Sequence, residues 1–222
     1  MKLLAIDTAT EQCSVAVRLD GRTIEQRVLT PRGHAELLLP MVEQVMTEAG
    51  CRLADLEGLA FGRGPGAFTG VRIAVGAIQG ISLGTGLPVV GVSTLAAVAQ
   101  QFARPGESVL VCMDARMNEV YWGIYACDDN GFVRLQGSEQ VGPPESVAVN
   151  DQRVATAVGT GFQAYPVLTE RHSGVRIDGA ALPRAADIAL LGEQALLRGE
   201  GQAAANAQPV YLRDQVAWAK QT

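Results

Sequence analysis

The chain has 222 residues, 48% of them hydrophobic and 18% charged, with a formal net charge of −5. This composition supports a packed core and excludes a largely disordered chain. The negative charge argues against electrostatic binding of nucleic acid by this protein alone. Its four cysteines are widely spaced and it has only two histidines, which argues against a disulfide framework and against a Cys/His metal site.

Three strands are predicted at the amino terminus, over residues 3–6, 14–19 and 23–29, with a two-residue hairpin turn at Asp20-Gly21. Asp7-Thr8-Ala9-Thr10 follows the first strand. An acid followed by small hydroxyl residues at a strand end is suited to facing a nucleotide phosphate or its metal ion. The alternative is that Asp7 and Thr10 cap the turn.

No membrane segment is expected. The apolar run before Asp7 is too short for a signal peptide, and four glycines with Pro88 interrupt the apolar stretch 71–92 well below the length of a membrane span. We therefore expect a cytoplasmic protein.

An amphipathic helix is predicted from His34 to Ala49, because its apolar residues recur at helical spacing and Gly50 follows. Such a stripe usually covers the protein's own sheet. Its two methionines, Met41 and Met46, also suit an adaptable partner surface.

The apolar run 56–61 predicts a strand, and residues 61–72 after it predict a glycine loop that leads into a helix. Glycines at 62, 64, 66 and 70 let a backbone or a ligand come close, and Thr69 is a candidate N-cap at a helix terminus that attracts anions. The loop is either a phosphate cradle or a tight turn.

The helix that follows, 71–83, holds several small residues. Glycine costs about 1 kcal/mol within a helix, so they indicate close approach to another helix.

Further along, a buried strand is predicted over 88–92 and a helix over 95–102 with Ser93 or Thr94 as its cap. Arg104-Pro105-Gly106 marks a boundary, which divides the chain into an N-terminal lobe (1–103) and a C-terminal lobe (104–222). Strands over 109–113, 120–125, 132–141 and 154–158 and a helix over 185–198 follow. Two α/β lobes fit this series, with the last segment a candidate to return to the first lobe.

Two patterns in the sequence are typical of enzymes. Gly80-Ile81-Ser82-Leu83-Gly84 matches G-x-S-x-G, with Asp114 and His172 following in the order of a hydrolase triad. Ser82 nevertheless falls at the end of a predicted helix, whereas a nucleophile elbow needs a strand-to-helix turn. Asp114-Ala115-Arg116 is either a pair of site residues at a strand end or a local salt bridge.

Six segments, taken together, form a family pattern: 4–10, 32–40, 64–72, 91–95, 114–116 and 211–213. They resemble the bacterial TsaB (YeaZ) family. The resemblance covers nearly the whole length and is weakest over 128–205. It implies a two-lobed fold of the actin-like ATPase and sugar kinase type (ASKHA, ribonuclease H-like). It also implies a role in forming N6-threonylcarbamoyladenosine (t6A) at position 37 of tRNAs that read ANN codons. Family members pair with the paralogue TsaD, which performs the transfer, while TsaE supplies an ATPase cycle.

The resemblance also implies that the chain is not itself an enzyme. The metal motif of TsaD, H-x-x-x-H, would fall on Thr94 and Val98, and neither side chain can replace an imidazole ligand. We therefore expect no catalytic residue, no metal site and no required cofactor, although ATP or ADP at the complex interface stays open. The residues expected to face such a nucleotide are Asp7, Thr8, Thr10, Gly66 and Thr69.

The resemblance places TsaD, or a second copy of the isolated chain, against the two long helices. TsaE is a further partner, and tRNA is expected to bind only through the complex. Val75→Arg or Val42→Asp is expected to abolish pairing while leaving the monomer folded. The expected interface residues are His34, Leu37, Leu38, Met41, Val42, Val45, Val71, Ala74, Val75 and Ile78.

Other classes of function stay open at this point. A small-molecule kinase of the same fold would use Asp7 and the glycine loops to hold ATP and Mg²⁺, and a peptidase would use Ser82. A homodimeric scaffold outside tRNA modification would bind neither TsaD nor nucleotide.

Overall fold

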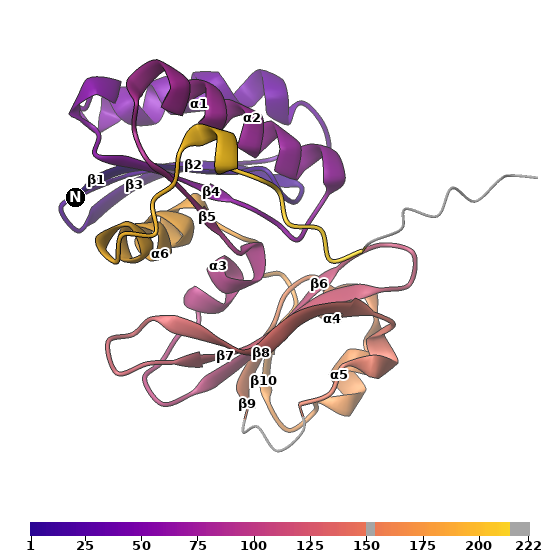
Figure 1. Cartoon of the computed structure of the whole chain (residues 1–222). Coiled ribbons are helices and arrows are strands. Elements are labelled where there is room, and N and C mark those ends of the chain that lie inside the picture. Colours follow the sequence, from indigo (N-terminus) through magenta and orange to yellow (C-terminus); the bar gives the residue numbers. More distant parts are fainter. Residues whose placement is uncertain (150–153, 214–222) are drawn as a thin grey trace, which may run out of the picture.

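Two α/β lobes make up the computed structural model, which describes residues 1–149 and 154–213 (Figure 1). In the first lobe, a five-stranded sheet has the order β3-β2-β1-β4-β5. Strands β1, β2 and β3 are antiparallel, whereas β4 and β5 run parallel to β1. The strands are β1 (Lys2–Asp7), β2 (Gln12–Leu19), β3 (Arg22–Leu29), β4 (Gly58–Gly62) and β5 (Val89–Val92). The predicted α/β fold of two lobes is confirmed.

The sequence of each strand matches its place in this sheet. The central strand β1 is buried on both faces from Leu3 to Asp7, as a nearly continuous apolar run requires. The edge strand β3 is polar and largely accessible, which discourages pairing with another sheet. Asp20 (φ 47°) and Gly21 (φ 91°) both adopt the positive φ that a tight hairpin needs.

The second lobe repeats this strand plan. Its sheet has the order β10-β9-β6-β7-β8, with β6, β7 and β8 antiparallel and β9 and β10 parallel to β6. Strand β10 was not predicted from the sequence, since three residues show no periodicity. The strands are β6 (Ser108–Asp114), β7 (Val120–Cys127), β8 (Val133–Gly142), β9 (Val154–Val158) and β10 (Arg176–Asp178).

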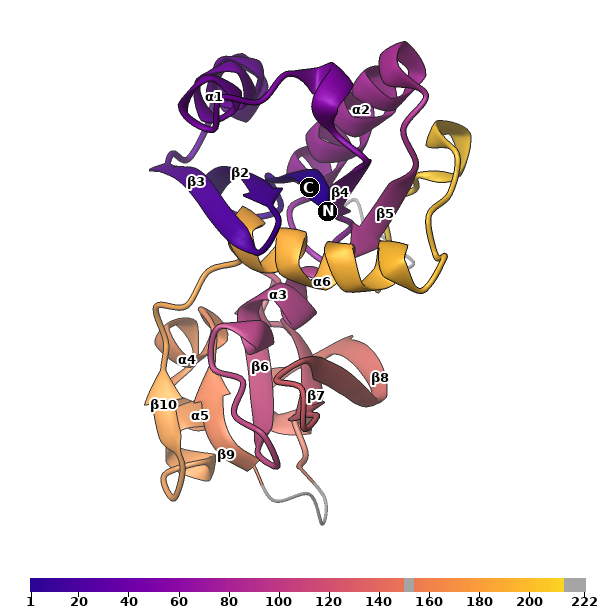
Figure 2. The same ribbon diagram turned by 90° about the vertical axis from the view of Figure 1, so that its left-hand side faces the viewer.

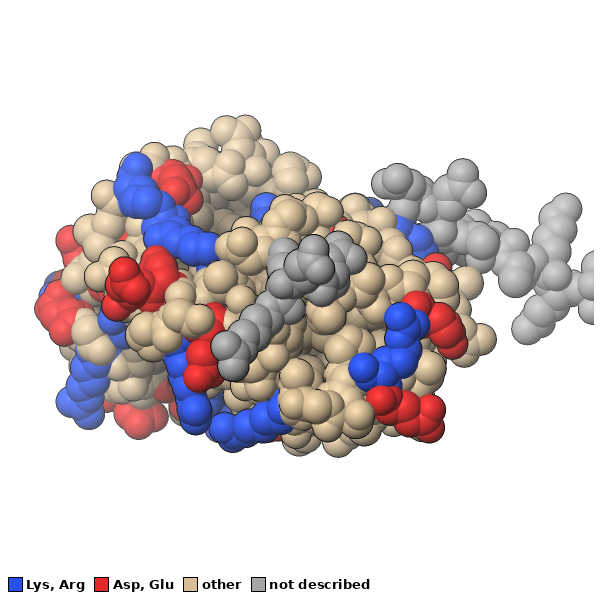
Figure 3. Space-filling view, turned by 90° about the horizontal axis from the view of Figure 1, so that it is seen from below, with Lys and Arg blue, Asp and Glu red and all other residues tan. Residues whose placement is uncertain are grey.

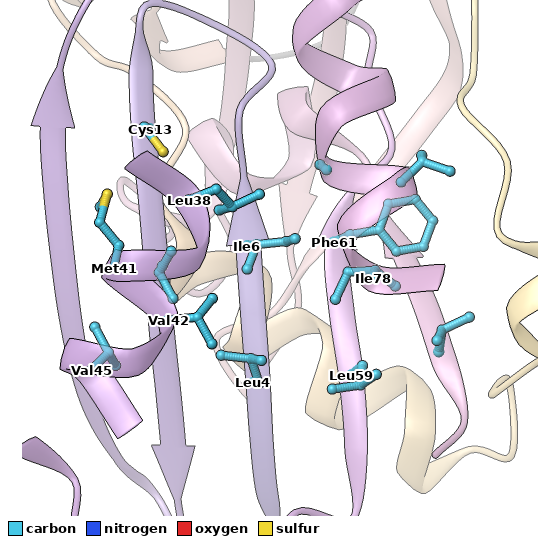
Figure 4. Close-up of a cluster of buried hydrophobic side chains, with 14 of the residues drawn as sticks. Leu4, Ile6, Cys13, Leu38, Met41, Val42, Val45, Leu59, Phe61 and Ile78 are labelled. Atoms are coloured by element: carbon cyan, nitrogen blue, oxygen red, sulfur yellow. The ribbon is translucent and has the colours of Figure 1, made fainter. Parts of the chain in front are cut away.

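Two long helices, α1 (His34–Glu48) and α2 (Phe68–Thr85), cover one face of the first sheet (Figure 2). Figure 4 shows their apolar side chains pointing at those of β1 and β4. Burying one side chain such as Leu38 or Ile78 contributes about 1.5–3 kcal/mol. The inner faces of α1 and α2 therefore form the main core of the first lobe.

The other face of the first sheet is covered by α6 (Ala185–Leu197), which comes late in the chain. Small residues let α6 lie close to the strands: a Cβ added at Gly192 would lie 2.7 Å from the Cβ of Ala60. Conversely, α3 (Thr94–Gln100) follows the first sheet but packs against Val109, Val111 and Tyr125 of the second. The expected boundary at residue 103 therefore separates the strands of the two sheets. The helices α3 and α6 do not follow it, because each packs on the sheet that lies on the other side of this boundary.

Short elements complete the second lobe. Helices α4 (Gly161–Ala164) and α5 (Pro166–Arg171) and the 3₁₀ turn η2 (Pro144–Ser146) pack in one cluster against its sheet. The sequence did not predict α4 and α5, which are too short to show a helical period. Two further 3₁₀ turns are η1 (Leu53–Asp55) and η3 (Ala204–Asn206).

The last described residues contact both lobes. The Val210 N–H donates to the Arg63 carbonyl at 2.7 Å, and Tyr211 accepts from Arg72 Nε at 2.8 Å. Arg213 reaches the second lobe, where it pairs with Glu119 and donates to the Ala115 carbonyl. None of the helices in the described ranges is long and apolar enough to span a membrane.

Candidate functional site: the interlobe cleft

A cavity of about 870 Å³ lies between the lobes and is lined by both. Its volume falls in the range of small-molecule sites, about 300–1,000 Å³. The first lobe contributes residues 8–11, 31–36, 65–67, 69, 70 and 73, and the second contributes residues 113–116, 121, 160, 163 and 164.

The wall on the first lobe is made by the glycine loop packed on the turn after β1. A Cβ added at Gly66 would lie 2.5 Å from the Ala9 carbonyl oxygen, and one at Gly70 would lie 2.0 Å from that of Thr8. The Thr8 hydroxyl donates to the Gly70 carbonyl at 2.7 Å, and the Ala67 N–H donates to the Ala9 carbonyl at 2.7 Å. The glycines at 66 and 70 therefore serve close backbone packing, the tight-turn alternative left open by the sequence.

The N-terminus of α2 lies in this wall. Its N-cap is Ala67, without a side-chain cap, so the prediction that Thr69 is the N-cap is wrong. Thr69 is instead an exposed residue of the first turn and lines the cleft. Because N–H groups of a first helical turn lack intrahelical acceptors, this end of the cleft favours an anionic group.

Asp7 does not face the cleft, which corrects the expectation from the sequence. It shares the strand face of Leu3 and Ala5, which pack toward α6, and it is 0% exposed. A Cβ added at Gly62 would lie 1.8 Å from Asp7 Oδ2. Oδ1 accepts from the Ala9 N–H at 3.2 Å, whereas Oδ2 has no partner among the described residues. Burial raises the pKa of this carboxyl to about 7.

The other four residues expected to face a nucleotide all line the cleft: Thr8, Thr10, Gly66 and Thr69. The hydroxyl of Thr8 is buried and already bonded to Gly70, so it fixes the wall. Thr10 and Thr69 are more accessible and are free to contact a ligand.

On the second lobe, the Asp114 and Arg116 side chains form a salt bridge at 3.1 Å, the local alternative left open by the sequence. Asp114 also accepts from the Tyr165 hydroxyl at 3.0 Å. The adjoining turn holds three successive non-glycine residues with positive φ, Arg116 (59°), Met117 (56°) and Asn118 (59°). Such a run is costly, and the Arg213 contacts to this turn hold it in place. No pattern in the sequence indicated this left-handed turn.

The expected partner surface is mostly core. Of its ten residues, eight are no more than 7% exposed in this chain, which corrects their assignment to a surface: Leu38, Met41, Val42, Val45, Val71, Ala74, Val75 and Ile78. They cover the sheet of the first lobe, as amphipathic stripes usually do (Figure 4). Leu37 is half-buried, and His34 is half-buried and lines the cleft. Val42→Asp and Val75→Arg are therefore expected to destabilise the monomer, because each places a charge in this core.

The outer face of α1 and α2 has a different character. Leu39, Phe68 and Leu83 are 58%, 48% and 79% exposed. A Cβ added at Gly76, Gly80 or Gly84 would meet nothing within 4 Å, so these glycines lie on a flat and open strip of α2. We call Leu39, Phe68, Gly76, Gly80, Leu83 and Gly84 the outer strip.

The structure does not support a hydrolase triad. Ser82 lies within α2, is 4% exposed and donates its hydroxyl to the Leu87 carbonyl at 2.6 Å. His172 is buried in the second lobe, where its Nδ1 contacts the Leu168 carbonyl. Across residues 1–149 and 154–213, no three His, Cys, Asp or Glu side chains gather where they could hold a metal ion.

The comparisons of this chain with known proteins agree on one family. A family model described as "TsaD: tRNA N6-adenosine threonylcarbamoyltransferase" matches residues 28–221. Relatives named "tRNA threonylcarbamoyladenosine biosynthesis protein TsaB" from Escherichia coli and Haemophilus influenzae are 46% and 39% identical. Each alignment covers 99% of this chain, with 98% and 97% of the relative.

Two solved structures from Pseudomonas aeruginosa match nearly the whole fold. One, "YeaZ", is 46% identical with a TM-score of 0.86, over 95% of this chain and 99% of that one. The other is described as an uncharacterized protein with similarity to peptidase YEAZ. It is 47% identical with a TM-score of 0.88, over 96% of this chain and 99% of that one. The resemblance found in the sequence is thereby confirmed.

Proposed function

The chain belongs to the TsaB family, and from that membership we propose that it is a non-catalytic activating subunit of the complex that forms t6A at position 37 of tRNAs reading ANN codons. The proposed partner is TsaD, which would perform the transfer, and TsaE would supply an ATPase cycle. The proposed location is the cytoplasm, where these partners and tRNA meet.

One observation carries the non-catalytic part of the proposal. The chain matches the TsaD family model over residues 28–221. By the resemblance read from the sequence, the histidine pair of that family falls on Thr94 and Val98 of this chain. Both residues are 0% exposed in α3, where Val98 packs in the core of the second lobe. A threonine and a valine cannot hold the transferase metal ion. The physical role we propose is differential binding, in which this chain stabilises the TsaD conformation that is competent for exchange of substrate and product.

We propose that TsaD packs on the outer strip of α1 and α2. Exposed Leu39, Phe68 and Leu83 provide apolar area, and the open glycines of α2 let another helix approach closely. A self-complementary contact of the same strip would pair two copies of the isolated chain.

A nucleotide at the complex interface is a further part of this proposal. The N-terminal turn of α2, with Thr69 and Thr10, suits a phosphate group in the interlobe cleft. The fit is partial, because Asp7 lies behind the wall and cannot ligate a metal ion in the cleft. This arrangement does not favour the kinase alternative.

Binding of tRNA would depend on the partners. The net charge is −5, and in Figure 3 basic and acidic side chains are mixed on the face that is shown. A mixed surface lacks the single-signed field that holds a phosphate backbone.

The decisive experiment is threonylcarbamoyl transfer to tRNA by purified TsaD and TsaE, with and without this chain. We expect transfer only in the complete mixture and none from this chain alone. Transfer by this chain alone would reveal a catalytic site, and no stimulation in any mixture would reject the activating role.

The interface is tested separately by size-exclusion chromatography with TsaD. Leu83→Asp and Gly80→Glu change exposed residues of the outer strip and should abolish co-elution while the monomer stays folded. Leu197→Asp is the matched control, because Leu197 is also an exposed helical leucine, at 64%, but lies on α6. Unchanged co-elution by both strip variants would place TsaD elsewhere.

A further inference from the structure

A second, smaller cavity shares no lining residue with the interlobe cleft. It measures about 250 Å³ and is lined by β5, the start of α3, the strands β7 and β8, and α6. Both lobes therefore contribute to it. Its volume lies below the range of about 300–1,000 Å³ typical of sites for drug-sized ligands, which restricts it to a small molecule.

Arg63 supplies an unpaired positive charge to this cavity. The residue follows β4, and its side chain lies across Gly91, where an added Cβ would be 3.2 Å from Arg63 Cβ. The Nε atom is buried and has no hydrogen-bond partner within the described part of the chain. A buried guanidinium N–H without an acceptor is unfavourable, so the Nε of Arg63 favours an external acceptor.

Glu139 supplies a negative charge that is held in a fixed orientation. Its Oε1 accepts hydrogen bonds from the hydroxyls of Ser93 and Tyr125, and Ser93 also caps α3 through the Leu95 N–H at 3.1 Å. Burial and the adjacent Glu139 carboxylate raise the pKa of Tyr125 well above its usual value, so its hydroxyl stays a donor. No described donor contacts Oε2, which stays free for a further hydrogen bond.

The remaining charged groups around the cavity are already paired. Arg198 pairs with Glu200 at 2.6 Å, and Arg134 pairs with Asp128 at 3.3 Å. Arg63 and Glu139 both line the cavity, yet no ion pair joins these two described residues. The cavity thus holds two opposite charges, each without a charged partner.

We propose that this Arg63–Glu139 cavity binds a free α-amino acid with a short side chain. The carboxylate of the amino acid would accept hydrogen bonds from the Arg63 guanidinium, and its ammonium group would donate to Glu139 Oε2. Apolar lining from Val90, Val92 and Ala96 suits a short aliphatic side chain. A simple anion would be repelled by Glu139, and a simple cation by Arg63. Only a zwitterion compensates both charges.

Isothermal titration calorimetry and ¹H–¹⁵N NMR on the full chain test this proposal, with glycine, alanine, valine and threonine as ligands. Acetate and ethylammonium serve as probes that carry one charge each. We expect at least one amino acid to bind at least tenfold more tightly than either probe. The amide signals of Gly91, Ser93 and Ala96 should shift, while those of Thr69 and Asp114 in the cleft stay unchanged. Acetate binding as tightly as the amino acids would overturn the proposal, as would the absence of amino acid binding or shifts confined to the cleft.

Variants locate the site. Arg63→Met and Glu139→Gln each remove one charge and should weaken amino acid binding at least tenfold, whereas the exposed Arg104→Met and Glu170→Gln are matched controls. Ala96→Leu fills the cavity without changing any charge and should also abolish binding, so the test stands even if a charge variant fails to fold. Far-UV circular dichroism checks folding. Wild-type affinity in folded Ala96→Leu would overturn the assignment.

Discussion

The two lobes share one strand plan but differ in the helices inserted into it. Each first strand ends in an aspartate, Asp7 or Asp114, and each fourth strand is followed by a glycine turn. In both lobes the glycines pack against carbonyl oxygens: Gly70 against Thr8, and Gly161 against Cys112. The turn of the first lobe leads into α2, of 18 residues, whereas that of the second leads into helices of 4 and 6 residues.

This difference shows that the sheets specify the scaffold and the inserted helices specify the outer surface. The shared glycine contacts hold each turn against its sheet, so they belong to the scaffold. Long helices with an accessible outer face occur on the first lobe within the described residues, which is why we place the partner there.

The largest effects on stability are expected in the two cores that lie beneath helices, one under α1 and α2 in the first lobe and one under α4 and α5 in the second. Leu38 of α1 and Leu168 of α5 are 1% and 0% exposed. Leu38→Ala and Leu168→Ala should each lower the free energy of unfolding by about 2–5 kcal/mol, through lost burial and the cavity left behind. Urea unfolding measures this. A cost below about 1 kcal/mol for Leu168→Ala would show that the short helices contribute little to the second lobe.

The stability of the chain should depend on pH through Asp7, the aspartate that ends β1. Burial raises the pKa of Asp7 from 3.8 to about 7, so the folded state holds its proton more tightly than the unfolded state does. Protonated Asp7 therefore makes its full contribution to the free energy of unfolding below pH 4. This contribution of about 4 kcal/mol is lost as the pH rises toward 7. Asp7→Asn should remove this loss.

The matched variant is Asp114→Asn, which changes the aspartate at the end of β6 and leaves Asp7 intact, so the loss of stability caused by Asp7 should remain. Urea unfolding between pH 4 and pH 8 compares the three proteins. Equal slopes for the wild type and Asp7→Asn would contradict the buried, proton-binding role of Asp7.

The glycine turns should tolerate a methyl group unequally. Gly70→Ala places Cβ 2.0 Å from the Thr8 carbonyl oxygen, whereas Gly161→Ala places it 2.9 Å from that of Cys112. Overpacking of this kind costs about 1–3 kcal/mol, and we expect Gly70→Ala to be the more destabilising of the two. Thermal unfolding ranks them.

Gly76→Ala is the control for that ranking, because it is also a glycine of α2 but its Cβ would meet nothing within 4 Å. There the better helix propensity of alanine should stabilise the chain by up to about 1 kcal/mol. Destabilisation by Gly76→Ala would mean that the outer strip is not open in solution.

The smallest effect is expected at the contact of the C-terminal segment with the second lobe. Arg213 and Glu119 are 21% and 33% exposed, so Arg213→Ala should cost about 0.2–1 kcal/mol. Hydrogen exchange should nevertheless become faster at residues 115–119, whose left-handed turn loses its support. Unchanged exchange there would show that the turn holds its own conformation.

Much of the fold could be predicted from the sequence, because its periodic segments are long. Strands β1–β9 and helices α1, α2, α3 and α6 were predicted close to their observed bounds. The missed elements, α4, α5 and β10, have three to six residues and carry no period. Their positions are set by packing on the second sheet.

The candidate site was predicted less well, for three physical reasons. The direction of Asp7 depends on which strand face α6 covers, and α6 is distant in sequence. The apolar stripe of α1 indicated that one face of this helix is buried. It did not show whether that face packs in the core of the chain or against a partner protein. The second cavity unites Ser93, Tyr125 and Glu139, residues 14 to 46 positions apart that only the folded lobes bring together.

The exchange of α3 and α6 between the lobes has a consequence for synthesis on the ribosome. The five strands of the first sheet are complete at residue 92, but the helix that covers Leu3, Ala5 and Ala60 begins at residue 185. At about 5–20 residues per second, this apolar face waits roughly 5–20 s for its cover. The nascent chain is therefore most exposed to aggregation in that interval, and a truncated product ending before residue 185 would keep this face permanently open.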